Sequence, residues 1–204
     1  MPYKIRPARP SDAKDVAPLI YSSGPRAFEF IFSIGEPKSC IDYLEDAFKG
    51  KKGLFSHQHH YVMEDNGNVL AVMASFTQGS MAKTQLATGL HIFKFMGLIK
   101  GFRSIVRGLI FEKKLVRAPL KGCYYIAHVG VSQEFRSMGI GEKMVAFIQD
   151  KAREKGVKKL ALDVSVINLR AQRLYERLNF KVIEERSSYR SELDCHRYME
   201  APVL

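Results

Sequence analysis

One stretch of this sequence says most about its structure, and it reads His128-Val129-Gly130-Val131-Ser132-Gln133-Glu134-Phe135-Arg136-Ser137-Met138-Gly139-Ile140-Gly141. An apolar run typical of a strand ends at Val131, and a turn with one basic residue and two glycines follows. After the turn, apolar residues recur at helical spacing, namely Ile140, Met144, Phe147, Ile148 and Ala152. The stretch therefore predicts a strand, a turn and a helix in direct succession.

A turn of this kind can bind an anion. The first turn of a helix has backbone N–H groups without intrahelical partners, and the helix dipole adds partial positive charge there, so phosphate is a natural ligand. Gly139 and Gly141 let a bulky anion come close to the backbone, and the guanidinium of Arg136 suits phosphate oxygens. These residues alone leave two interpretations open, a phosphate cradle or a glycine-containing turn before an amphipathic helix.

The turn also half-matches the dinucleotide-binding fingerprint G-x-G-x-x-G. Residues 139–144 supply its first two glycines, and Asp163 lies at about the distance of the acid that binds the ribose. However, Met144 occupies the third glycine position, and seven residues separate Val131 from Gly139, whereas the turn in a Rossmann fold is tight. Both departures argue against a nicotinamide or flavin site.

Two sequence motifs resemble conserved motifs of the GCN5-related N-acetyltransferase (GNAT) superfamily, and they occur in the same order and at the same spacing. Residues 136–141 look like its Q/R-x-x-G-x-G/A motif, in which the amides of the turn hold the pyrophosphate of coenzyme A. Residues 162–180 resemble its second conserved block, a strand and an Asn followed by A-x-x-L-Y-x-x-x-G-F, and are similar there to ribosomal-protein N-terminal acetyltransferases. The resemblance is good over residues 121–186, fair over residues 1–22 and 56–77, and absent over 78–120.

The resemblance implies an α/β (α+β) GNAT fold with a mixed, mostly antiparallel sheet of about six or seven strands and helices on both faces. A parallel pair of strands at 124–131 and 159–164 is expected to splay apart. On the second of these strands, Leu160, Leu162 and Val164 should share one face, and Asp163 the other. We expect one acetyltransferase domain over residues 1–204, with a basic helical insertion at 78–120.

The resemblance also implies the chemistry, which is transfer of an acetyl group from acetyl-CoA to a primary amine by direct attack. Tyr175 matches the Tyr that protonates the departing thiolate. Asp163 matches in position a Glu that deprotonates the amine, and His128 is a second candidate base because imidazole titrates near neutral pH. Coenzyme A is expected to contact Val129, Gly130, Val131, Arg136, Ser137, Met138, Gly139, Ile140, Gly141, Asn168 and Ala171.

Each candidate has a simpler alternative. Tyr175 could be a core aromatic, Asp163 an exposed strand residue and His128 a core residue, and water could carry the proton of the amine without a strong base. Residues 21–34 line the acceptor pocket in the resembled family, so Phe28, Glu29, Phe30 and Phe32 are acceptor candidates or plain core. The alternative function is a non-catalytic module of the same fold that binds acyl-CoA or regulates.

The composition of the chain bears on its cellular compartment and on whether it binds a metal. No run of about 18 apolar residues free of charge appears, so no membrane span is expected. Three scattered cysteines without C-x-x-C spacing favour a reducing cytoplasm and argue against zinc or a disulfide framework. The run His57-Gln58-His59-His60 has no third ligand in sight, so no metal is expected.

The insertion at 78–120 holds most of the net charge of +11, because residues 78–122 contain nine Lys and Arg against Glu112 alone, a net of +8. Apolar residues from Ile92 to Ile110 follow helical spacing, which predicts a basic amphipathic helix, or two helices broken near Gly97 or Gly101. Such a segment could pack on the sheet, cover the acceptor site, form a dimer contact or lie on an anionic membrane.

We rank the membrane surface last of these roles because the glycines interrupt the apolar stripe. Nucleic acid is not expected as a partner, since the segment lacks a dense array of stacking side chains. The expected partner is a small-molecule or protein amine. A basic wall on the acceptor site favours acceptors that carry a carboxylate or a phosphate.

Overall fold

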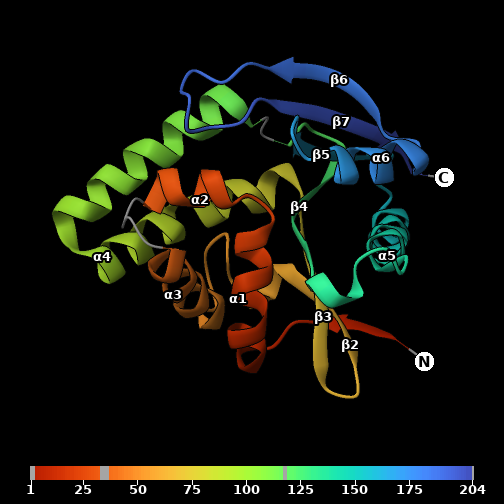
Figure 1. Cartoon of the computed structure of the whole chain (residues 1–204), viewed down its shortest axis with the longest axis horizontal. Helices are drawn as coiled ribbons and strands as arrows, with labels where there is room; N and C mark the ends of the chain where they lie inside the picture. The colour runs from red at the N-terminus through yellow and green to blue at the C-terminus, as the bar shows by residue number, and fades with distance from the viewer. Residues whose placement is uncertain (1–2, 33–36, 117–118, 204) are drawn as a thin grey trace.

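The computed structural model describes residues 3–32, 37–116 and 119–203, and its described strands form a single seven-stranded sheet. The strand order is β1-β2-β3-β4-β5-β7-β6, and the described pairs are antiparallel except for β4 with β5 (Figure 1). The strands are β1 (Lys4–Pro7), β2 (His60–Asp65), β3 (Asn68–Phe76), β4 (Cys123–Val131), β5 (Lys159–Ser165), β6 (Lys181–Arg186) and β7 (His196–Pro202). The predicted α/β architecture with one parallel pair is confirmed.

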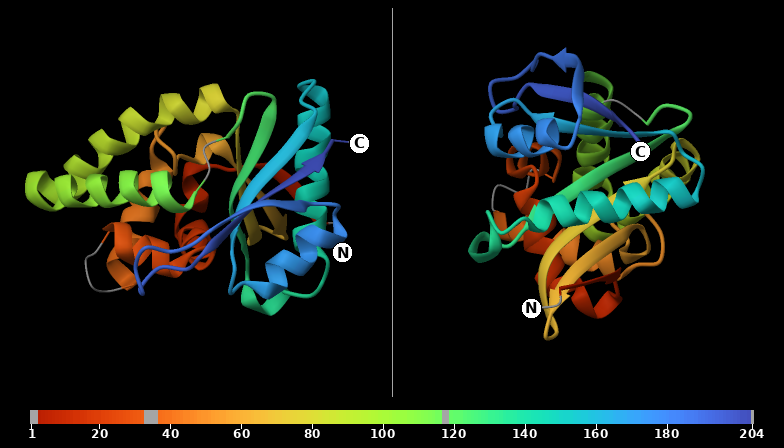
Figure 2. Two further views of the ribbon diagram at one scale, coloured as in Figure 1. Left: turned by 90° about the horizontal axis from the view of Figure 1, so that it is seen from above. Right: turned by 90° about the vertical axis from the view of Figure 1, so that its right-hand side faces the viewer.

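Helices cover both faces of the sheet (Figure 2). They are η1 (Pro10–Asp12), α1 (Ala13–Ser22), α2 (Pro25–Phe32), α3 (Pro37–Lys49), η2 (His57–His59), α4 (Gln78–Leu115), η3 (Gln133–Phe135), α5 (Ile140–Glu154) and α6 (Leu169–Arg177). On one face, α5 and α6 bury a core against the sheet, and on the other α1 and α3 pack on Val62 and Val72. Each large apolar side chain buried in this way stabilises the fold by about 1.5–3 kcal/mol.

Strand β5 follows the predicted alternation. Leu160, Leu162 and Val164 belong to the core under α5 and α6. Ala161 faces the other way and packs with Tyr125 of β4 and Tyr198 of β7, where Met81 of α4 also contacts this cluster. The face of β5 that carries Ala161 and Asp163 is therefore the face toward α4.

A buried ion-pair network joins β1, β2 and the start of α1. The Arg6 guanidinium donates to both carboxylate oxygens of Asp12 (2.7 and 2.9 Å), and its Nε donates to Glu64 (2.6 Å). Asp12 also accepts the backbone N–H of Arg9 (2.7 Å), which caps η1. These bonds hold the first helix against the edge of the sheet.

Helix α4 is a hairpin of two helical arms, at residues 78–96 and 98–115. Gly97 separates them with φ 75° and ψ 177°, a conformation that side chains with a Cβ rarely adopt. Gln85 Nε2 donates to Glu112 Oε2 across the hairpin (3.3 Å), and Gly101 lies against the Phe93 ring. The insertion is therefore two helices broken at Gly97, while Gly101 lies within the second arm.

In the part of the chain that the structure describes, every helix is too short or too polar to cross a lipid bilayer.

Candidate active site

Strands β4 and β5 separate partway along their length. They pair in parallel only from Cys123 to Ile126 and from Lys159 to Leu162 in the described residues. Beyond Ile126, β4 continues beside β3, and a register shift between Val72 and Ala74 leaves an extra residue on β4. His128 lies in this bulge with φ 54°. The predicted splay between the parallel strands is thus present, and it begins after Ile126.

A cavity of about 1540 Å³ passes through this gap. At one end it is lined by residues 135–137 and 139, between β4 and α5, by the first turn of α5, and by α6. At the other end its walls come from α2 and both arms of α4. The cavity therefore connects the glycine-containing turn on one side of the sheet with α4 on the other.

The turn has the geometry of an anion-binding site. Ser137 (φ 68°) and Gly139 (φ 74°) lie in the left-handed region, and α5 begins at Ile140 with its first N–H groups at the cavity. A Cβ at Gly139 would enter space with no atom within 4 Å, which is the room that a phosphate needs. Arg136 and Arg170 also line this end, so its electrostatics suit a phosphorylated ligand.

Most predicted coenzyme A contacts line the cavity, namely Val129, Val131, Arg136, Ser137, Gly139, Ile140, Gly141, Asn168 and Ala171. Gly130 is not among the lining residues, because its backbone packs on α1, where a Cβ would overlap the Leu19 carbonyl. Met138 is about half exposed and does not line the cavity. The Asn168 side chain accepts the Ala171 N–H (3.1 Å), so it caps α6.

Tyr175 projects from α6 into the cavity lining and is only 5% exposed. Its ring packs on Phe180, with 5.6 Å between the ring centres. Burial raises the pKa of the Tyr175 phenol well above its usual value. The phenol therefore stays protonated at neutral pH and can donate a proton or a hydrogen bond.

Asp163 lies on the α4 side of the gap. The Tyr125 hydroxyl donates to its Oδ2 (2.7 Å) across the parallel strand pair. Burial and the Asp163 charge raise the pKa of Tyr125 well above its ordinary value, so Tyr125 remains a donor. Asp163 is half-buried and lines the cavity, and it is oriented by a neighbour rather than fully exposed.

His128 lines the cavity but is also packed among aromatic rings, including Phe55 at 5.0 Å between ring centres. The Ser56 carbonyl oxygen can only accept a hydrogen bond, so His60 Nδ1, 2.8 Å away, must carry a proton and donate it. In the neutral ring, His60 Nε2 is then unprotonated and can accept a hydrogen bond. His128 Nδ1 then donates to His60 Nε2 (3.1 Å), which leaves a lone pair on His128 Nε2. Burial and the charge of His59 lower the pKa of His128 to about 4, so it is a weaker base than an ordinary histidine.

The predicted acceptor residues of α2 divide into two sets. Phe28 and Phe32 line the cavity. Glu29 instead accepts from the Tyr21 hydroxyl (2.9 Å), and the Phe30 ring lies under Arg107. In the structure, neither Glu29 nor Phe30 is part of the cavity wall.

Several polar residues of the cavity were not singled out from the sequence, among them Glu112 and His196. Glu112 of α4 lines the cavity, accepts a long hydrogen bond from Gln85, and has its pKa raised by burial. His196 of β7 also lines the cavity, and its Nδ1 donates a hydrogen bond to the Asp194 carbonyl (3.0 Å). Burial lowers the pKa of His196, so the ring is neutral and its Nε2 carries an unshared electron pair that can accept a proton. A sequence signal for His196 is its place two residues before Tyr198, since alternate residues of a strand share one face.

The α4 wall is not the basic wall that the sequence suggested. The charged residues of α4 at the cavity are Glu112 and the exposed Lys113, and the other cations of α4 lie elsewhere. Ser104, which is 2% exposed, also lines this wall, and its hydroxyl has no hydrogen-bond partner among the described residues. The hairpin is the physical reason, because it leaves most cations of α4 exposed to solvent and places one carboxylate, Glu112, at the cavity.

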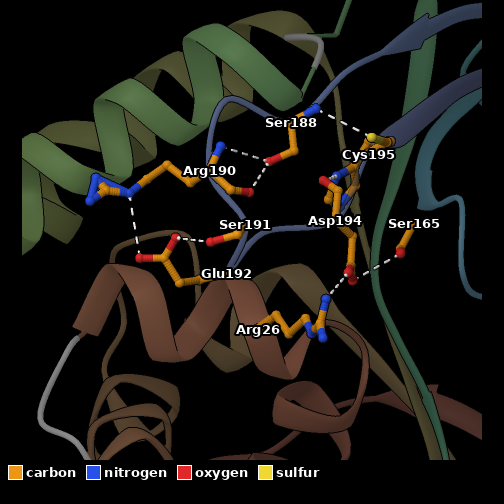
Figure 3. A network of polar contacts seen from close by, with 9 residues as sticks. Arg26, Ser165, Ser188, Arg190, Ser191, Glu192, Asp194 and Cys195 are labelled. Carbon is orange, nitrogen blue, oxygen red and sulfur yellow. Dashed lines mark hydrogen bonds and ion pairs between the residues drawn. The ribbon is translucent and has the colours of Figure 1, made fainter.

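Polar contacts hold the connection from β6 to β7 beside this wall (Figure 3). Asp194 accepts from Arg26 of α2 (2.8 Å) and from Ser165 at the end of β5 (3.0 Å). Leu193 is buried with Phe111 and Leu115 of α4. These contacts fix the position of His196 at the cavity.

In the described residues, no three His, Cys, Asp or Glu side chains are grouped so that they could hold a metal ion. Within the histidine run, His57 and His59 lie in η2, and His60 is buried against His128.

Known proteins match this architecture. The model of the acetyltransferase (GNAT) family matches residues 26–180. The 5-NmdU N-acetyltransferase of Pseudomonas phage PaMx11 is 33% identical over 96 residues, which is 47% of this chain and 59% of the phage protein. The chain thus aligns with about three-fifths of the length of this curated relative.

Solved structures share the fold. An N-acetyltransferase from Staphylococcus aureus Mu50 superimposes with a TM-score of 0.71 at 18% identity, over 97% of this chain and all of the other. The yncA protein of Salmonella typhimurium, solved with its cofactor acetyl-CoA, gives a TM-score of 0.53 at 12% identity, over 100% of this chain and 95% of the other.

Proposed function

Because this chain belongs to the acetyltransferase (GNAT) family, we propose that it transfers an acetyl group from acetyl-CoA to a primary amine by direct attack. The observation that carries the proposal is the cavity through the gap between β4 and β5. It connects the turn proposed to bind phosphate with the wall formed by α2 and α4, so two substrates can meet inside the sheet. We further propose that residues 1–204 act as one acetyltransferase domain, with α4 as its insertion.

The donor occupies the end of the cavity at α5. The N–H groups of the turn, with Arg136 and Arg170, bind phosphate oxygens. The edge of β4 from Ala127 to Val131 faces the gap without a β5 partner in the described residues, so its backbone can pair with the amide groups of pantetheine. The yncA complex with acetyl-CoA supports this donor in the same fold.

The reaction balances without a covalent enzyme intermediate. The amine nitrogen attacks the thioester carbonyl, a C–N bond forms, the C–S bond breaks, and one proton leaves the amine while another reaches the thiolate. Tyr175 is the proton donor, since its buried phenol remains protonated. A cysteine nucleophile is disfavoured at Cys40, because burial and Glu29 raise the pKa of its thiol to about 12.

The acceptor occupies the α4 end of the cavity. Asp163, oriented by Tyr125, accepts the amine proton directly or through water. Glu112 and the Ser104 hydroxyl offer polar contacts in a wall that is otherwise largely apolar, with Phe28, Phe32 and Ile92. A carboxylate in such a wall favours a neutral or cationic amine over an anionic one.

The test is an assay of free thiol release from acetyl-CoA with a panel of primary amines that differ in charge. Acetylation of at least one amine, confirmed by mass spectrometry, is the expected result. Tight binding of coenzyme A without transfer to any amine would support the alternative, a non-catalytic module of this fold.

A further inference from the structure

The α4 hairpin has an apolar outer surface. Its inner side buries Ile92, Ser104 and Phe111 against the rest of the protein. Its outer side exposes apolar residues at helical spacing on both arms, namely Leu86, Leu90, Leu98, Ile99, Phe102, Val106 and Ile110. Leu98 and Ile99, next to the turn, are 79% and 81% exposed. An apolar patch of this extent indicates a contact with another molecule.

The charge around this surface has one sign. Every exposed charged side chain of α4 is cationic, namely Lys83, Lys94, Lys100, Arg103, Lys114 and Lys113, which also borders the cavity. Its one carboxylate, Glu112, lines the cavity and bonds to Gln85. The partner of the outer surface must therefore accept apolar side chains and carry negative charge.

The hairpin also has the right placement for a flat partner. Its turn projects away from the sheet and from the helices that pack on it (Figures 1 and 2). The break at Gly97 leaves exposed apolar residues on both arms, Leu86 and Leu90 before it and Leu98, Ile99, Phe102, Val106 and Ile110 after it. The glycine break is therefore compatible with contact between both arms and a membrane surface.

We propose that the outer face of the α4 hairpin docks on an anionic lipid surface. Apolar side chains of an amphipathic helix enter the boundary between headgroups and acyl chains, while flanking Lys and Arg bind lipid phosphates. A second copy fits less well, because two identical faces would oppose cations with cations. Nucleic acid also fits less well, because aliphatic side chains predominate on the face and cannot stack on bases.

The test is co-sedimentation of the full chain with phosphatidylcholine vesicles, with and without phosphatidylglycerol. We expect binding to vesicles that contain phosphatidylglycerol and its loss at high salt. The double variant Leu98→Ser/Ile99→Ser should bind about tenfold more weakly, because two inserted side chains lose their apolar groups. The matched control is Ile183→Ser, at an exposed apolar residue of β6, which should bind like the wild type.

A second pair of variants tests the charge. Lys100→Gln/Arg103→Gln should weaken binding to the anionic vesicles, while Lys155→Gln/Lys158→Gln, with the same loss of charge after α5, should not. All of these positions are exposed, so circular dichroism should show unchanged folding. Equal binding by both pairs, a dimer that Leu98→Ser/Ile99→Ser separates, or retention on DNA instead of vesicles would each overturn the proposal.

Discussion

The Tyr125 hydroxyl donates a 2.7 Å hydrogen bond to the Asp163 carboxylate across the parallel pair of strands. The two residues lie where the strands separate, with Tyr125 in the paired region and Asp163 directly after its last pair, so the bond orients a carboxylate at the gap. Tyr125→Phe keeps the ring and removes the donor. We expect kcat to fall about tenfold with little change in KM for acetyl-CoA, because one hydrogen bond to a charged group contributes about 1.5–3 kcal/mol. Tyr124→Phe, on the opposite face of β4, is the control and should be neutral.

Tyr175 is expected to act as the general acid, with its phenol giving a proton to the departing thiolate. Tyr175→Phe leaves the packing on Phe180 and should lower kcat by about 10²–10⁴-fold, the usual range for loss of a general acid. Burial raises the pKa of the phenol, so the wild-type rate should show no loss of this acid up to about pH 10, the ordinary tyrosine pKa. Steady-state kinetics and calorimetry with coenzyme A separate the two effects. An unchanged kcat in Tyr175→Phe would remove Tyr175 from the mechanism.

Much of the fold could be predicted because its signals are local. The alternation of β5, the Asn168 cap and the glycine turn each depend on residues close in sequence. Asn66 (φ 49°) and Gly67 (φ 84°) likewise form a hairpin turn of the Asn-Gly type, which favours positive φ, and Asn179 (φ 63°) adopts the left-handed conformation that Asn tolerates.

The remaining features depend on contacts between distant segments. Helical spacing of apolar residues in α4 could not distinguish a buried stripe from an exposed one, since that depends on the fold at Gly97. The same fold turns Glu112 toward the cavity. The bulge at His128 defeats simple strand alternation, because one extra residue reverses the side to which the chain points.

Gly139 should be needed both for the stability of the fold and for the binding of coenzyme A. Gly139→Ala forces a Cβ into a left-handed position (φ 74°) and into the space proposed for the phosphate. Gly156→Ala is a matched control, because Gly156 also has positive φ (65°) and open space but follows α5 at its far end. Both should destabilise the fold by about 1–2 kcal/mol. Only Gly139→Ala should raise the Kd of coenzyme A in calorimetry, and equal Kd values would contradict the proposed phosphate site.

The buried ion pair between Arg6 and Asp12 should make the free energy of unfolding depend on pH in the acid range. Burial alone raises the pKa of Asp12, but hydrogen bonds and charge from Arg6 and Arg9 lower it below the ordinary value. The ion pair therefore contributes stability above the unfolded pKa of about 3.9, and this is lost as pH falls through the folded pKa. Asp12→Asn should cost about 3–5 kcal/mol at neutral pH, because it leaves a buried guanidinium less compensated.

Urea unfolding across pH tests this prediction. The stability of the wild type should approach that of Asp12→Asn in acid, while Asp15→Asn, on the exposed side of α1, should follow the wild type at every pH. A constant difference between wild type and Asp12→Asn from neutral pH to strong acid would rule out the ionised pair as the source of stability.

Glu112 should select the acceptor by charge. Glu112→Gln retains a side chain of similar size beside Gln85 and removes the negative charge from the α4 wall. For a cationic amine such as a diamine, KM should rise about tenfold, because one charge-assisted hydrogen bond is lost. For a neutral monoamine KM should change little. Glu176→Gln, at an exposed residue of α6, controls for net charge. If Glu112→Gln raises both KM values equally, Glu112 positions the wall and does not recognise acceptor charge.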